Sequence, residues 1–235
     1  LRHGWRAALV PVAAIGALVF AAFALRVRPT EPTTPDVSFR DEFRPDLLRE
    51  LLSRKAIRFT VLLGVVTEFI TQGLFSFLPT FFVEYHGYST ARAGYLFSGF
   101  FLVLAVGGIV VGNVSDRYGR DGTIAGCMVF AGLGSLFLLV DRLWIVLVAV
   151  FLIGVGTCGV IVVQSRILDY LSEDEEGTGF GLVRTVYMIL GSSGSVTVGF
   201  FADRFDWTVS FGFIGLLCAV VLVCYAVNWW FELGY

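Results

Sequence analysis

Seven apolar segments, each long enough to cross a lipid bilayer as a helix, restrict what this sequence can fold into. A transmembrane α-helix needs about 20 apolar residues, because the hydrocarbon core is roughly 30 Å thick and a helix rises about 1.5 Å per residue. The segments occupy residues 7–25, 59–83, 93–114, 122–140, 143–164, 178–201 and 208–230. This pattern predicts an all-α, polytopic membrane helix bundle with about seven transmembrane helices.

The composition supports a membrane protein and excludes one class of partner. The chain is 57% hydrophobic and only 15% charged, and its mean hydropathy is +0.81, outside the range of soluble globular domains. Its formal net charge is −2, without the clustered basic residues that bind nucleic acids. We therefore expect the lipid bilayer to surround the chain, and we expect no nucleic-acid partner.

The longest polar stretch, residues 26–58, separates the first apolar segment from the other six. Four leucines in it share one face of a predicted short helix, namely Leu47, Leu48, Leu51 and Leu52. This pattern is typical of an amphipathic helix at the membrane surface, but a solvated linker helix has the same pattern.

Lysines and arginines are unevenly distributed between the two sides of the membrane that the alternating segments define. One side carries eleven of them, most within residues 26–58, and the other side carries five. Cytoplasmic loops hold the excess of Lys and Arg. We therefore expect this stretch and the loop at 112–120 to be cytoplasmic, in a multi-pass protein of the plasma (inner) membrane.

The loop between the third and fourth segments, Gly112 to Arg120, is dense in glycine and charge. Gly112 allows close approach of helices, Gly119 permits a turn with positive φ, and Asp116 is a fixed anion at the membrane edge. Asp116 could lie against the N-terminus of the helix that begins near Thr178, because helix N-termini favour negative charge.

Ion pairs from this loop could hold the cytoplasmic side of the helix bundle closed. The candidates join Arg117 or Arg120 to an acid such as Asp169. The alternative is a purely topological turn that carries positive charge on the inside and has no role in gating.

The loop resembles the signature loop of the major facilitator superfamily in the spacing of five residues, Gly112-x-x-x-Asp116-Arg117-x-Gly119-Arg120. In that family the helices form two six-helix halves, and the loop recurs between the second and third helices of each half, where it is understood as a conformational latch. This chain departs from the family pattern at Asp121, where another basic residue is frequent. The departure would weaken attraction to lipid headgroups or acidic partners.

The resemblance, which covers essentially the whole chain, implies three parts. Residues 1–27 would be the last transmembrane helix of an amino-terminal half, residues 28–57 the central cytoplasmic loop with its amphipathic helix, and residues 58–235 the six-helix carboxy-terminal bundle. The implied protein partner is the amino-terminal half of the same transporter.

Glu68 is the outstanding polar residue within a segment. It lies about ten residues beyond Arg58, or roughly 15 Å along a helix, and so near the bilayer midplane. A charge at that depth costs at least about 2.5 kcal/mol, so Glu68 should face a cavity, be paired or be protonated. We expect Glu68 and Gln72, one helical turn later, to serve proton coupling or substrate binding; the alternative is a buried structural hydrogen bond.

Arg184 is the only basic residue within a segment, and Tyr187 follows one helical turn later. We expect this pair to belong to the same polar site. Arg184 could pair with Glu68 or bind an anionic group of the substrate. It is also shallow enough for its side chain to reach the cytoplasmic interface.

No residue pattern predicts an enzyme. Residues 154–159 match a glycine-rich nucleotide-binding string, but the string lies in the middle of an apolar segment and instead predicts close helix packing. The four cysteines lack metal-ligand spacing, and no Ser/His/Asp or Cys/His arrangement is present. We expect no catalytic residues, no metal site and no cofactor.

These features favour a secondary active transporter that moves a small solute by alternating access in symport or antiport. Glu68 favours a proton as the coupling ion, and sodium is the alternative. The second hypothesis is a truncated or split transporter fragment with only a structural or assembly role, because the resemblance places five helices outside this chain. No sequence feature identifies the small-molecule substrate.

Overall fold

The computed structural model describes residues 4–27 and 44–231, in two compact units, Leu1–Phe43 and Arg44–Tyr235. The first unit contains α1 (Gly4–Arg26), whose described side chains, from Leu9 onward, are exposed within that unit. Such exposure suits an apolar helix that lipid or other helices surround. Residues 28–43, which include most of the predicted central loop, lie outside the described residues.

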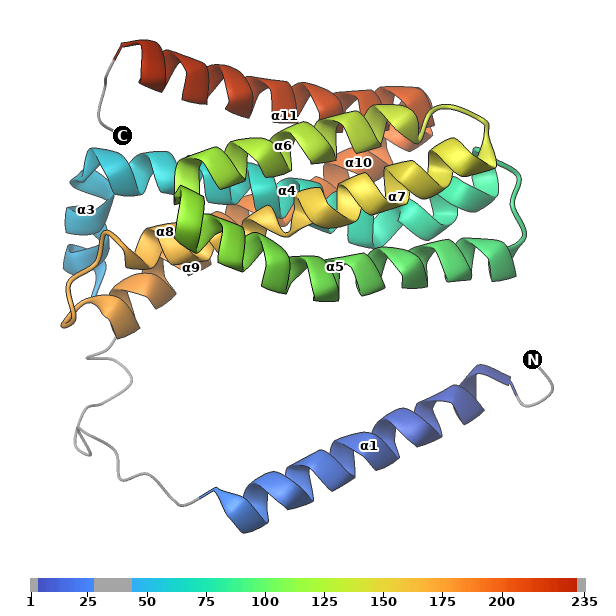
Figure 1. The fold of residues 1–235 in the computed structure, drawn as a ribbon, viewed down its shortest axis with the longest axis horizontal. Coiled ribbons are helices and arrows are strands. Elements are labelled where there is room, and N and C mark those ends of the chain that lie inside the picture. The colour runs from blue at the N-terminus through green and yellow to red at the C-terminus, as the bar shows by residue number, and fades with distance from the viewer. Residues whose placement is uncertain (1–3, 28–43, 232–235) are drawn as a thin grey trace. The chain divides into compact units, whose positions relative to one another are not determined.

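The second unit is a bundle of helices (Figure 1). In chain order they are α3 (Pro45–Ser53), α4 (Lys55–Glu84), α5 (Thr90–Tyr118), α6 (Arg120–Phe137), α7 (Leu143–Thr157), α8 (Gly159–Leu168), α9 (Glu176–Gly191), α10 (Ser193–Arg204) and α11 (Trp207–Trp230). Helix is the only regular secondary structure in the described ranges, which confirms the predicted all-α class.

Each predicted apolar segment forms one helix or two consecutive helices. Two segments contain a local turn, at Cys158 between α7 and α8 and at Ser192 between α9 and α10, where the backbone stays in the right-handed helical region. Each pair therefore forms one continuous candidate span, Leu143–Leu168 and Glu176–Arg204.

Six spans in the described residues are long and apolar enough to cross a membrane. Helix α6, which covers the fourth predicted segment, is not among them, because its 18 residues include Arg120 and Asp121 in the first turn. It packs extensively against both α7 and α11 within the bundle. The chain is thus a multi-pass membrane protein with α6 as an integral part of its helix bundle.

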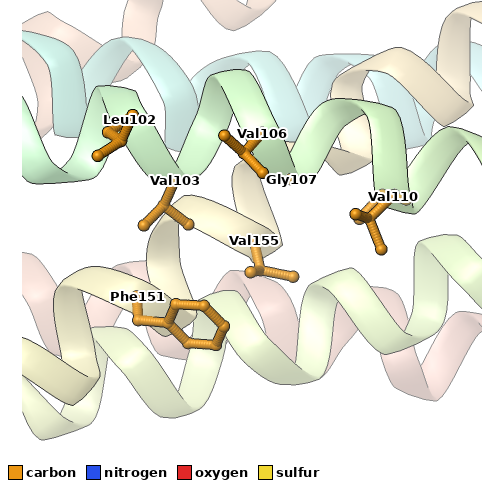
Figure 2. Close-up of a pocket in the computed structure, with 8 residues that line it drawn as sticks. Leu102, Val103, Val106, Gly107, Val110, Phe151 and Val155 are labelled. Atoms are coloured by element: carbon orange, nitrogen blue, oxygen red, sulfur yellow. The ribbon is translucent and has the colours of Figure 1, made fainter.

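The surface between α5 and α7 is apolar. Leu102, Val106 and Phe151 are each more than half exposed. They line a groove of about 360 Å³ that contains no polar side chain (Figure 2). Such a surface suits the acyl chains of a bilayer and offers nothing to hold a polar solute.

Glycines determine how closely α7 approaches its neighbours. A Cβ atom at Gly154 would lie 2.7 Å from Cγ1 of Val103 in α5, and one at Gly156 would lie 2.5 Å from the backbone nitrogen of Ala131 in α6. Real Cβ atoms do not approach other atoms so closely, so only glycine fits. The glycine string at 154–159 therefore packs helices together, as predicted.

Helix α3 forms where the leucine pattern predicts it, but its apolar face meets protein. Leu47 and Leu51 are buried, and they pack with residues of α4, α8 and α9, namely Ile57, Ile167, Val183 and Tyr187. Gly179 in α9 leaves room for Leu51, because a Cβ there would lie 3.1 Å from the leucine Cδ1. Leu48 and Leu52 are only partly buried, and a position of α3 at the membrane surface stays a prediction.

Candidate functional site

The hairpin between α5 and α6 gathers its charges around Arg120. Gly119 has φ of +94°, so α5 ends and α6 begins within a single residue. Arg120 donates from Nε to Oδ2 of Asp169 at 3.0 Å, and from Nη1 to Oδ1 of Asp116 at 2.5 Å and to Oγ of Ser115 at 3.0 Å. The structure thus contains one of the two ion pairs considered from the sequence, which links α6 to the end of α8.

A second ion pair beside the first was not predicted. Asp121 accepts from Nε of Arg166 at 2.7 Å, and the Arg166 side chain is only 2% exposed. Two consecutive residues of α6 with opposite charges therefore form ion pairs with α8 and its end: Arg120 with Asp169, and Asp121 with Arg166. The departure from the family pattern at Asp121 supplies the carboxylate that a buried arginine requires.

Arg166 also connects α8 to α4. Its Nη1 donates to the Thr60 hydroxyl and, at 3.4 Å, to the carbonyl of Ala56. The guanidinium carbon lies 5.5 Å from the ring centroid of Phe59 and 5.1 Å from that of Tyr170. These contacts hold the buried guanidinium in place by hydrogen bonding and by cation–π attraction. The sequence contains a signal for this pair, because Asp121 and Arg166 have opposite charges and lie near the ends of adjoining predicted segments.

The remaining hairpin residues face open space in this unit. A Cβ at Gly112 would meet nothing within 4 Å, so its predicted role in close packing has no partner among the described residues. Arg117 is exposed, and the Asp116 side chain is 66% exposed. Within the described ranges, no hydrogen bond joins Asp116 to the first turn of α9, because its carboxylate binds Arg120 instead.

Glu68 lies in the middle of α4 and is 7% exposed. Its Oε1 accepts from Nε2 of Gln72 at 2.6 Å, so the two residues predicted to act together do meet. The stem of Glu68 packs against Gly191 of α9, where a Cβ would lie 2.5 Å from the Glu68 Cβ. Glu68 therefore sits at a contact between two helices.

Tyr187 is 2% exposed and packs against Gly64 of α4. Its hydroxyl is buried without a hydrogen-bond partner among the described residues. Arg184 is exposed on this unit, with its guanidinium carbon 5.9 Å from the ring centroid of Phe180. The described residues show no ion pair between Arg184 and Glu68, so the structure does not form that predicted pairing.

The junction of α3 and α4 binds the loop before α9 through charge. Arg54 donates from Nη2 to Oε1 of Glu175 at 2.6 Å and from Nη1 to Oε2 at 2.9 Å, and it also binds Glu50 at 3.0 Å. The Arg54 guanidinium lowers the pKa of Glu175 to about 2. The hydrogen bonds that Arg54 donates to Glu175 and Glu50 raise the pKa of Arg54 in turn.

The other end of the bundle is organised around a histidine. Nε2 of His86 lies 2.8 Å from the carbonyl oxygen of Leu138, and Nδ1 lies 3.4 Å from Oδ1 of Asp141. The histidine side chain is fully buried, and its ring stacks on Tyr88 with centroids 5.1 Å apart. This residue ties the loop after α4 to the loop after α6. No group of three or more possible metal ligands occurs in the described part of the chain.

Comparison with known proteins places this bundle in a family. The model of the Major Facilitator Superfamily matches residues 84–233. The chain belongs to this superfamily. Its members are transporters that act in the lipid bilayer on small molecules, and the membership agrees with the resemblance carried by the hairpin.

Two curated relatives of this superfamily chain are transporters. The glycerol-3-phosphate transporter of Bacillus subtilis (strain 168) is 24% identical over 195 residues, which cover 78% of this chain and 43% of that protein. A vacuolar membrane amino acid uptake transporter of Schizosaccharomyces pombe is 28% identical over 115 residues, 48% of this chain and 20% of that protein. The chain therefore spans less than half the length of these relatives.

The fold also matches a solved structure. The crystal structure of a POT family transporter aligns with a TM-score of 0.65 and 20% sequence identity, over 74% of this chain and 37% of that chain. At this identity the likeness shows the fold, which confirms the predicted superfamily-type helix bundle.

Proposed function

We propose that the chain forms part of a secondary active transporter that moves a small solute by alternating access and is driven by a proton gradient. In this proposal it acts as a transporter and not as an enzyme. Superfamily membership supports the class of protein. The proton coupling is carried by one observation, the burial of Glu68 in the middle of a membrane span.

Glu68 has the properties that a proton carrier needs. Ionised carboxylates are costly within the bilayer, so a carboxylate at that depth gains or loses a proton as its surroundings change. Gln72 supplies a donor at 2.6 Å that can hold either form in place. Tyr187 and Arg184, on the neighbouring α9, complete the polar site that we propose for coupling and substrate binding.

The hairpin is proposed as the latch of one gate. The Arg120–Asp169 pair joins α6 to the end of α8 and is partly exposed, so water can replace it at modest cost. Gly112 and Arg117 have space beside them in this unit, where the other half of the transporter could dock. Asp116 completes the latch through its bond to Arg120.

The complete transporter would contain two six-helix halves. We propose that residues 1–27 supply the last helix of the amino-terminal half, residues 28–57 the central loop and residues 58–235 the carboxy-terminal half. The excess of Lys and Arg supports a cytoplasmic position for the central loop and the hairpin. We propose the plasma membrane as the location.

Two substrate classes deserve the first test. One relative is a glycerol-3-phosphate transporter and another takes up amino acids. Both substrates carry an anionic group, which Arg184 could bind by a charge-assisted hydrogen bond. A small anionic solute is therefore our first candidate.

Transport by the complete protein in proteoliposomes tests the proposal. We expect uptake of radiolabelled glycerol-3-phosphate or of an amino acid to rise several-fold when a pH gradient is imposed. Glu68→Gln should abolish that response, whereas Glu84→Gln, an exposed carboxylate at the end of the same helix, should keep it. Uptake by Glu68→Gln with an unchanged pH response would rule out the coupling role.

A further inference from the structure

Helices α4 and α9 fit together through two reciprocal contacts between a glycine and a polar residue. A Cβ at Gly191 would lie 2.5 Å from Cβ and 2.8 Å from Cγ of Glu68. A Cβ at Gly64 would lie 2.8 Å from Cγ of Tyr187. Each helix therefore presents one polar side chain and one glycine, and each glycine receives the polar side chain of the other helix.

The spacing fixes the register of the two helices. Gly64 and Glu68 are four residues apart on α4, and Tyr187 and Gly191 are four residues apart on α9, so each pair lies on one helix face. The close approach continues into α10, where a Cβ at Gly194 would overlap the carbonyl group of Phe69. Little space is left between the two backbones for water.

This contact suits a neutral Glu68. A carboxylate at a dry helix contact loses its hydration, and the Gln72 amide at Oε1 is the hydrogen-bond partner that the described residues provide. An ionised Glu68 needs water or a cation, and admitting either one requires the helices to separate. Protonation removes that requirement.

Few other ionisable groups face Glu68. On α9, Tyr187 interacts electrostatically with Glu68 and with Arg184. Helix α7 carries no ionisable side chain, and the charges of α3, α5 and α10 lie at or near the helix ends. Groups on α6, α8 and α11 are engaged with one another at the hairpin end, namely Asp121, Arg166 and Tyr225.

We infer that Gly64 and Gly191 are positioning residues through which the α4–α9 contact closes when Glu68 is protonated and loosens when Glu68 is ionised. The inference rests on the proposed proton coupling and adds the structural element that responds to the proton. Gly191 allows the closed state, because any larger side chain would hold the Glu68 stem away from α9.

A distance measurement between spin labels tests this without knowledge of the substrate. The labels are placed at Leu62→Cys and Met188→Cys, both exposed on this unit, in the complete transporter with its native cysteines replaced. Raising the pH from 5 to 8 should lengthen the distance by on the order of 2–3 Å, the width of one water layer. Glu68→Gln should hold the short distance at both pH values.

Three glycine variants separate positioning from packing. Gly191→Ala should give the long distance at both pH values. Gly156→Ala introduces an equally tight clash between α7 and α6, away from Glu68, and Gly181→Ala adds a methyl group to α9 where nothing lies within 4 Å. Both controls should keep the pH response of the unmodified protein.

The distance measurements test the inference, and the transport measurements test the proposed proton coupling. A pH response that persists in Glu68→Gln, or in Gly191→Ala, overturns the inference. If the Gly191→Ala protein does not reach the membrane, Gly64→Ala is used instead, because the Tyr187 ring can shift to make room for the added methyl group. A change of distance with pH as large as in the unmodified protein would then overturn the inference. Transport that ignores pH while the distance still responds would overturn the proposed coupling and leave the inference standing.

Discussion

The two ends of the helix bundle are held together by different chemistry. The hairpin end, around Arg120 and Asp121, is built from ion pairs to α8, one of which contains a buried arginine. The opposite end, around His86, is built from stacked aromatic rings and hydrogen bonds to a carbonyl and a carboxylate. Both ends join loops or helix termini that are distant in sequence.

This difference indicates which end of the bundle can open at a small cost in free energy. Ion pairs at a water interface exchange readily with water, because their net stabilisation is only about 0–1 kcal/mol. Aromatic packing has no such substitute, since its contacts depend on close fit. The Asp121–Arg166 pair is the exception at the hairpin end, because its arginine is buried and cannot exchange its carboxylate for water at low cost.

Asp121→Asn should have the largest effect on stability. It leaves the buried Arg166 charge without its carboxylate, a change that costs about 3–5 kcal/mol for a fully buried pair. Because the Asp121 side chain is 50% exposed, we expect about 2–3 kcal/mol. Thermal unfolding in detergent measures the effect, with Asp116→Asn as the control. Equal stability of the two variants would mean that the Asp121–Arg166 ion pair does not stabilise the hairpin end.

His86→Phe should destabilise the opposite end by a smaller amount. The ring packing on Tyr88 remains, but two hydrogen bonds are lost and the Leu138 carbonyl loses a donor, which costs about 1–2 kcal/mol. Tyr85→Phe removes one exposed hydrogen bond to Leu139 and serves as the control. The same unfolding assay applies. A His86→Phe protein as stable as the control would show that stacking alone holds this end.

Asp169→Asn should change stability by less than about 1 kcal/mol, because both partners of the pair with Arg120 are partly exposed. It should nevertheless loosen the proposed latch. We expect a thiol reagent to label Ser165→Cys, near the end of α8, up to about five times faster, the factor that corresponds to ~1 kcal/mol. An unchanged labelling rate in the complete transporter would argue against a latch at this pair.

Glu175→Gln should have the smallest effect and a defined pH dependence. The folded-state pKa of Glu175, about 2, lies below its ordinary value of 4.5 because of Arg54. Its contribution is therefore fully present above about pH 5 and is lost as the pH falls toward about 2. The stability difference between the two proteins should be constant from pH 7 to pH 5 and should shrink below pH 4. A difference that already shrinks between pH 7 and pH 6 would exclude this ion pair as its source.

Most of the fold could be predicted from the sequence, because each apolar segment carries its own signal. Hydropathy located all seven helical regions, and glycine at 119 indicated the turn with positive φ. The sequence also suggested an ion pair from Arg117 or Arg120 to an acid such as Asp169, and the structure contains the pair with Arg120. These predictions depend on local composition and on the cost of charge near lipid.

Contacts between helices could not be predicted in the same way. Nothing in α4 alone reveals that Gly64 receives Tyr187, since that depends on which helix lies beside it and in which register. Asp121 looked like a departure from a pattern until the position of Arg166 was known. The leucine face of α3 was ambiguous because lipid, water and protein can each satisfy an amphipathic helix.

The reciprocal contact between α4 and α9 has a consequence for evolution. A larger residue at position 64 would require a smaller side chain at position 187, because a Cβ at position 64 would lie 2.8 Å from Cγ of Tyr187. Positions 64 and 187 should therefore vary together among relatives. Position 191 is more restricted, because a Cβ there would meet the Cβ of residue 68 and the backbone oxygen of Val65. The glycine at position 191 should therefore persist even in a lineage that abandoned the acid at position 68.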